Sequence, residues 1–154
     1  MTHQQYIQRA AALAEQSISE GGGPFGAVIV KQGIEISTGK NMVTKNRNPT
    51  AHAEIVAIQE ACRKLDDFKL DGCILYSSCE PCPMCFGAIY WAGLDAVYYA
   101  GTRSDAAEAG FDDARIYDEL NQERGRRSIP FIELRQENRD PFRTWNKKTD
   151  KTRY

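Results

Sequence analysis

Two short stretches dominate this sequence: Thr50-Ala-His-Ala-Glu54 and Cys79-Glu-Pro-Cys-Pro-Met-Cys85. The chain has two histidines and five cysteines, and one of those histidines and three of those cysteines stand in these stretches. Two thiolates and one imidazole suit Zn²⁺, and three protein ligands leave its fourth tetrahedral position to water, as in catalytic zinc sites. His52, Cys82 and Cys85 are therefore the predicted zinc ligands.

The spacing within the stretches supports this prediction. Cys82 and Cys85 are three residues apart, so they share one face of a helix, and the positive end of the helix dipole favours thiolates there. Glu54 lies two residues from His52, within reach of a water on the same metal, where it would act as a proton shuttle. Residues two apart do not share a helix face, so this geometry requires His52 to cap its helix.

Each motif also has an ordinary structural reading when taken alone. A histidine two residues before a glutamate is often a cap or a surface pair, and a lone C-x-x-C can be redox-active or buried. Cys79 forms a second C-x-x-C with Cys82 and could complete a closed structural zinc site, although we expect it to be a buried thiol. Cys62 and Cys73 are predicted core residues, and His3 is predicted to be solvated.

Length and composition favour one cytoplasmic domain. The 154 residues can bury a full core, and no apolar run approaches the roughly 20 residues of a membrane helix. The N-terminus lacks the features of a secretory signal, so a cytoplasmic location with reduced thiols is expected. A net charge of −1 offers no overall field for nucleic acid or an anionic membrane.

Hydrophobic periodicity predicts helices that alternate with strands. Such an order predicts a three-layer α/β/α domain with a central five-stranded mixed sheet, opened by an antiparallel hairpin and continued by crossovers. The predicted helices cover 3–19, 52–65, 83–92, 113–123 and 141–145, and the predicted strands cover 26–31, 34–38, 73–77, 96–100 and 129–134.

H-x-E followed by P-C-x-x-C is typical of the zinc-dependent nucleobase deaminases, and the chain resembles the cytidine deaminase superfamily. Within it, the sequence is similar to the bacterial guanine deaminases over nearly its whole length. The segments that carry this resemblance are Gly22–Val30, Asn48–Glu54, Ser78–Trp91 and Glu108–Asp113.

The resemblance implies hydrolysis of guanine to xanthine and ammonia, with Glu54 moving the proton of a zinc-activated water to the ring. By the same resemblance, Asn41 hydrogen-bonds the purine, Phe25 stacks on it, Ala53 offers backbone groups, and Asp113 contacts the amino edge and assists proton transfer. A carboxylate suits that edge because the N1–H and the amine of guanine are both donors. Without the family, Phe25 more often reads as a core residue, Asn41 as a turn residue and Asp113 as a helix cap.

The resemblance also implies a homodimer in which the C-terminal segment, about 136–154, crosses to the partner and Tyr154 closes its active site. Tyr90 and Trp91 are expected to pack in the core or against another subunit.

Several other functions stay open at this point. A tRNA adenosine deaminase shares the zinc motif, and the basic tail that includes Arg143, Lys147 and Lys148 resembles an RNA-binding strip. The acidic Phe111-Asp-Asp113 segment favours a small purine over a phosphate backbone. Guanosine presents the same amino edge as guanine, a pyrimidine substrate is a more distant possibility, and a zinc-stabilised binding module without catalysis is a further alternative.

Overall fold

The sheet of this protein has four strands in the order β2-β1-β3-β4. The computed structural model describes residues 1–154, which form two compact units, 1–113 and 114–154. Strand β1 pairs antiparallel with β2 and β3, whereas β3 and β4 run parallel, so the sheet is mixed as predicted. The strands are β1 (Gly26–Lys31), β2 (Ile34–Lys40), β3 (Cys73–Cys79) and β4 (Ala96–Gly101).

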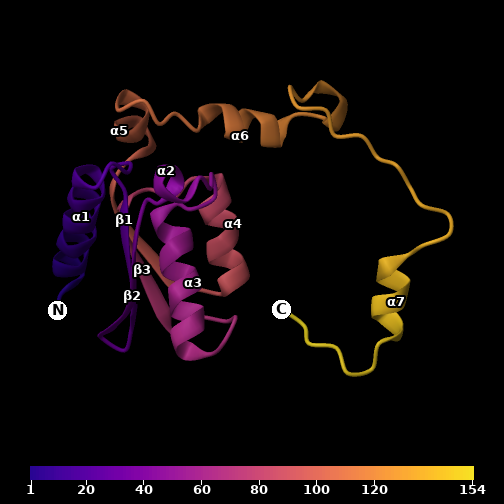
Figure 1. Cartoon of the computed structure of the whole chain (residues 1–154), viewed down its shortest axis with the longest axis horizontal. Coiled ribbons are helices and arrows are strands. Elements are labelled where there is room, and N and C mark those ends of the chain that lie inside the picture. The colour runs from indigo at the N-terminus through magenta and orange to yellow at the C-terminus, as the bar shows by residue number, and fades with distance from the viewer. The chain divides into compact units, whose positions relative to one another are not determined.

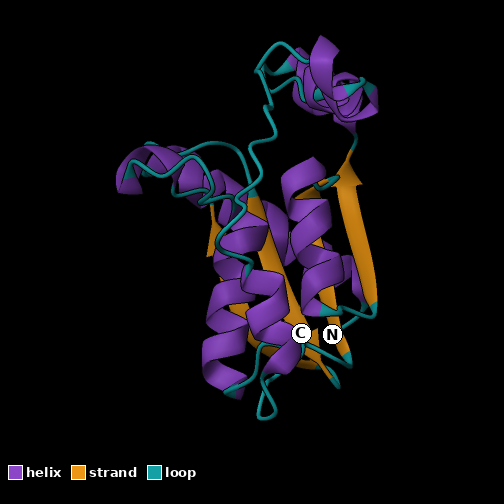
Figure 2. Cartoon of the chain, turned by 90° about the vertical axis from the view of Figure 1, so that its right-hand side faces the viewer, coloured by secondary structure: helices purple, strands orange, loops and turns teal.

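Helices cover both faces of this sheet (Figures 1 and 2). Helix α1 (His3–Ser19) packs on the face that carries Val28, Val30 and Tyr76. Helices α3 (Ala53–Leu65) and α4 (Pro83–Ala92) pack on the opposite face, which carries Ala27 and Leu75. Alternate residues of one strand point to opposite faces, so the two cores follow from the strand period. The first unit is therefore the predicted three-layer arrangement.

Two short helices that periodicity did not predict lie beside strand ends: α2 (Val43–Asn46) and α5 (Arg103–Glu108). Helix α5 begins with a capping box in which Thr102 and Asp105 satisfy each other's backbone N–H groups. No helix is both long enough and apolar enough to cross a membrane.

The predicted fifth strand at 129–134 is wrong. The second unit contains α6 (Ala114–Asn121), the 3₁₀ helix η1 (Arg124–Arg126) and α7 (Pro141–Lys147), and its segment 129–134 is neither helix nor strand. Pro130 has no N–H to donate, and no strand of the unit lies beside the segment to accept pairing. The apolar side chains that suggested a strand are instead 61–81% exposed: Ile129, Phe131, Ile132 and Leu134.

One smaller prediction also needs correction. His3 is not merely solvated, because its Nδ1 lies 2.7 Å from the Tyr76 hydroxyl and its ring stacks on Tyr98 at 4.2 Å. Helix α1 begins at His3, as predicted. Tyr90 and Trp91 are 71% and 66% exposed, so of their two predicted locations the core is excluded and a contact with another subunit stays a prediction.

Gly39 of β2 allows α3 to approach the sheet. A Cβ built at Gly39 would overlap the Ala53 carbonyl oxygen and would lie 2.8 Å from the Ala57 nitrogen. Both atoms belong to the backbone of α3, which cannot move aside as a flexible side chain would. The first turn of α3 carries Glu54 and follows His52, so this close contact fixes the position of both residues.

Gly39→Ala is expected to destabilise the fold by about 1–3 kcal/mol, because added volume in a packed contact forces backbone shifts. Urea denaturation monitored by circular dichroism measures this change. Gly125→Ala is the matched control, since a Cβ there meets nothing within 4 Å, and it should change the free energy of unfolding by less than about 0.5 kcal/mol. Equal stability of the two variants would contradict the role of Gly39.

Candidate active site

The three predicted metal ligands meet at the N-termini of two neighbouring helices. His52 is the N-cap of α3, and Cys82 is the N-cap of α4, with Pro83 in the first turn. The His52 Nδ1 atom lies 3.5 Å from the Cys82 Sγ and 3.6 Å from the Cys85 Sγ. All the candidate ligand atoms lie within 4.8 Å of one another.

This spacing fits zinc. Tetrahedral zinc with Zn–S and Zn–N bonds of about 2.3 and 2.05 Å separates sulfur from nitrogen by about 3.5 Å, which matches both observed separations. The donor set of two thiols and one imidazole is also the set that zinc prefers. His52, Cys82 and Cys85 can therefore hold one zinc ion and leave one position open.

The electrostatics of the three residues already favour a charged sulfur. Hydrogen bonds from Cys85 and from His52 outweigh burial and lower the pKa of Cys82 to about 4. The same Cys82–Cys85 hydrogen bond, together with burial, raises the pKa of Cys85, and the bond to Cys82 raises the pKa of His52. A metal ion that binds all three groups must displace the shared protons, so its binding releases protons to solvent.

Glu54 is buried beside this cluster, with 5% of its surface exposed. Its Oε1 accepts a hydrogen bond from the Ser77 hydroxyl at 3.3 Å, and its Oε2 accepts one from the Cys85 thiol at 3.5 Å. Burial raises the pKa of Glu54 above its usual value. The predicted capping geometry is confirmed, because His52 has extended backbone angles (φ −67°, ψ 156°) outside the helix.

Ser77 is a site residue that the sequence reasoning missed. It lies on β3 and, like Cys73 and Leu75, points toward α3 and α4, where it is 2% exposed. A serine on an otherwise apolar strand face needs a polar partner, since an unpaired buried hydroxyl is costly. The position of Ser77 on an apolar strand face could have indicated that it needs a polar partner. Only the fold identifies this partner as Glu54.

Asn41 and Phe25 lie next to each other at one end of the hairpin. The Asn41 N–H donates to the Phe25 carbonyl at 3.1 Å, and the buried Ser17 hydroxyl donates to the Asn41 carbonyl at 3.3 Å. The Asn41 side-chain oxygen accepts from the Val43 N–H at 3.2 Å, which fixes the orientation of the amide. The Asn41 amide group is thereby held in place by its oxygen.

Ala53 is fully buried in the first turn of α3, where no side chain caps the helix. Its N–H is among the first N–H groups of that helix, which have no intrahelical acceptor. Asp113 ends the first unit, and its Oδ1 accepts from the Arg103 Nε at 3.4 Å. It precedes α6 rather than beginning it, contrary to the predicted helix 113–123. Tyr154 ends the second unit and is 76% exposed.

Cys79 does not belong to the metal cluster. Its Sγ contacts the Thr102 carbonyl at 3.8 Å, and burial followed by the charge of Glu54 raises its pKa to about 11. It is the buried thiol that the sequence predicted. Burial likewise raises the pKa of Cys62 and of Cys73, so both remain thiols.

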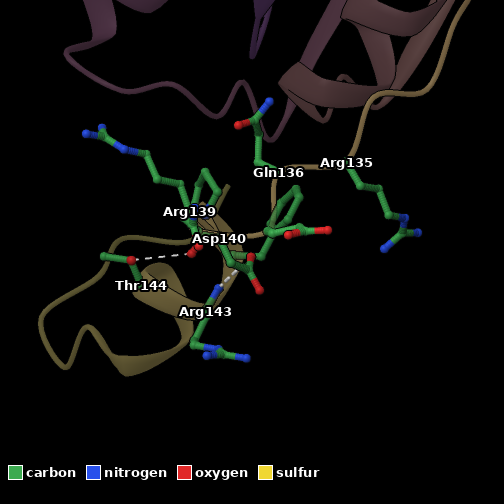
Figure 3. Close-up of a pocket in the computed structure, with 10 residues that line it drawn as sticks. Arg135, Gln136, Arg139, Asp140, Arg143 and Thr144 are labelled. Carbon is green, nitrogen blue, oxygen red and sulfur yellow. Dashed lines mark hydrogen bonds between the residues drawn. The ribbon is translucent and has the colours of Figure 1, made fainter.

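A separate hollow in the second unit is lined by residues 135–144 (Figure 3). Asp140 caps α7 there by accepting from the Arg143 N–H at 3.2 Å. The guanidinium groups of Arg135, Arg139 and Arg143 point in different directions in Figure 3 and do not converge on one position. The hollow contains none of the predicted site residues.

Cys82→Ala is expected to abolish zinc binding, because two protein ligands cannot hold the ion as three do. Cys79→Ala is the matched control and should retain zinc at about one ion per chain. Metal analysis by mass spectrometry of both purified variants gives the stoichiometry. Loss of zinc from Cys79→Ala would instead indicate a closed four-ligand site.

Known proteins resemble the chain in both sequence and structure. Guanine deaminase of Bacillus subtilis is 51% identical over the full length of both chains, and its X-ray structure superposes with a TM-score of 0.98, covering 100% of this chain and 99% of that one. A guanine deaminase structure from Nitrosomonas europaea is 36% identical with a TM-score of 0.67, covering 70% and 63% of the two chains.

A more distant relative acts on RNA. The tRNA-specific adenosine deaminase of Aquifex aeolicus is 40% identical over 65% of this chain and 66% of its own length. The family model described as the cytidine and deoxycytidylate deaminase zinc-binding region matches residues 1–101, which include the whole zinc cluster and Glu54. The chain belongs to this zinc-binding deaminase family.

Proposed function

We propose that this protein is a guanine deaminase that hydrolyses guanine to xanthine and ammonia. The observation that carries the proposal is a zinc-type cluster with a buried glutamate beside it, in a chain 51% identical to a guanine deaminase over its full length. In this reaction water adds at C2 of the purine, and the amino group leaves as ammonia.

His52, Cys82 and Cys85 would hold zinc, which would lower the pKa of a water molecule and so supply the nucleophile. Glu54 would accept a proton from this water and donate it to the ring nitrogen, which prepares the amine to leave. The raised pKa of Glu54 suits both halves of this exchange, and its hydrogen bond from Ser77 holds the carboxylate in one orientation.

The proposed substrate contacts come from Asn41, Phe25, Ala53 and Asp113. Asn41 donates from its fixed amide to a purine acceptor, Phe25 packs against the ring, and the N–H of Ala53 provides a further donor. Asp113 accepts from the N1–H and the amine, since an ionised carboxylate only accepts hydrogen bonds. A pyrimidine or an adenine does not present this pair of adjacent donors.

The other candidate functions fit the chain less well. The tRNA-specific relative matches about two thirds of this chain, whereas the guanine deaminase relative matches all of it. A net charge of −1 gives no general attraction for a phosphate backbone. Guanosine differs from guanine only around N9, so it is the alternative to test beside the free base. The buried Glu54 speaks against a binding module without catalysis.

We further propose a homodimer in which segment 136–154 crosses to the partner subunit. The second unit exposes Phe131, Ile132 and Phe142 at 61–79%, and α4 of the first unit exposes Phe86, Tyr90 and Trp91 at 55–71%. Large apolar side chains exposed to this extent favour burial against another chain. Tyr154 at the end of that segment is the proposed lid over the partner's purine site.

Glu54→Gln should lower kcat for guanine by about 10²–10⁴-fold, because general acid–base catalysis contributes that much, and should retain zinc. Ammonia release from guanine, guanosine, a tRNA anticodon stem-loop and cytosine measures activity and specificity together. Glu60→Gln is the control on the same helix, where Glu60 is paired with Arg63 away from the cluster, and it should remain active. Failure of the wild-type protein to release ammonia from guanine would refute the proposed function.

Truncation after Asp150 removes Tyr154 and should lower kcat/KM for guanine by at least about tenfold, since a closing lid positions the substrate and excludes water. Zinc content and dimer mass, measured by light scattering, should stay unchanged. Full activity of the truncated protein would rule out the lid, and a monomeric wild-type protein would rule out the exchanged segment.

A further inference from the structure

Asp113 lies in a segment that has no regular structure to hold it. Residues 111–113 belong to neither helix nor strand, and they follow Gly110, whose φ is +92°. The Phe111 N–H donates to the Ala106 carbonyl at 2.9 Å, and the Phe111 ring packs edge-on against Phe25 with centroids 5.0 Å apart. The segment therefore lies beside the proposed stacking residue, and side-chain contacts must fix where the Asp113 carboxylate points.

Arg103 provides the contact to that carboxylate. Its Nε donates to the Asp113 Oδ1 at 3.4 Å, and the Asp113 side chain is 18% exposed while that of Arg103 is 40% exposed. A carboxylate has two oxygens with about four acceptor positions, so one hydrogen bond from Arg103 leaves capacity for donors of a substrate. The guanidinium group is planar and has fixed donor directions, which suits it to orient a carboxylate.

The backbone of Arg103 is in turn tied to the metal loop. Its N–H donates to the Glu80 Oε2 at 3.2 Å, and the Glu80 N–H donates to the Gly101 carbonyl at 2.8 Å. Glu80 stands between Cys79 and the ligand Cys82. A continuous set of contacts thus runs from the metal loop through Glu80 and Arg103 to Asp113.

We propose that Arg103 is a positioning residue that holds the Asp113 carboxylate at a fixed place relative to the metal loop. In that place Asp113 meets the N1–H and the amine of guanine while C2 faces the zinc cluster. The proposal rests on the proposed function, and it assigns to Arg103 a role in substrate orientation without contact to the reacting atoms. Arg103 lies outside the motifs that the sequence resemblance singled out.

A double-mutant cycle with Arg103→Gln, Asp113→Asn and the double variant tests this role with guanine as substrate. Arg103→Gln should raise KM about tenfold, with a smaller effect on kcat, because it removes orientation and leaves Glu54 and the ligands in place. The double variant should match Asp113→Asn within about twofold, since residues that act through one contact are not additive. Arg103→Lys should recover part of the loss.

Arg9→Gln is the matched control, because the Arg9 Nε also lies 3.4 Å from a carboxylate oxygen, that of Glu35, and Arg9 is 44% exposed. Arg9→Gln and Arg103→Gln should both change Tm only slightly, and Arg9→Gln should leave the KM for guanine unchanged. The role of Arg103 is overturned if the losses of kcat/KM in the two single variants multiply in the double variant, or if Arg103→Gln leaves KM unchanged. In either case, guanine turnover by the wild-type protein still supports the proposed function. A wild-type protein inactive on guanine overturns both.

Discussion

The close approach of two helix N-termini is the constraint on which the rest of the structure depends. His52 caps α3, Cys82 caps α4, and their ligand atoms lie 3.5 Å apart. Both helices must therefore lie on the same sheet face and begin at the same end of it. Gly39 permits the close packing of α3, and β3 continues to Cys79 before the chain turns into α4. The fold is arranged so that these two ends meet.

The same arrangement explains why charge is tolerated inside the protein. An isolated buried carboxylate costs several kcal/mol, and the Cys82 sulfur, whose pKa is lowered to about 4, adds to this cost because its negative charge raises the pKa of Glu54. Helix N-termini carry partial positive charge, and Ser77 donates a hydrogen bond to Glu54. These contributions offset part of the cost, and a divalent cation held by the three ligands offsets more. The centre is thus built for a metal, and its acidic groups are placed around that charge.

The sequence predicted the features that depend on local spacing. Pro83 indicated the start of α4, the spacing of His52 and Glu54 required a cap that the structure contains, and alternation predicted four of the strands. The failures depended on distant partners. Ser77 is 23 residues from Glu54, and Tyr76 is 73 residues from His3, so neither contact was visible in a local pattern. Segment 129–134 has the residues of a strand but no neighbouring strand to pair with.

The zinc-type cluster and the contact between Arg103 and Asp113 lie in different parts of the chain. The zinc cluster and Glu54 lie within residues 1–101, the region shared across the deaminase family, and they suit attack of water on any amino-substituted ring. Arg103, Phe111 and Asp113 follow that region, and here the Asp113 carboxylate accepts a hydrogen bond from Arg103. In the proposed function the amino edge of the purine meets this segment, which is separate from the two helix N-termini that hold the cluster. The guanine deaminase relative matches the whole of this chain, whereas the tRNA-specific relative matches 65% of it.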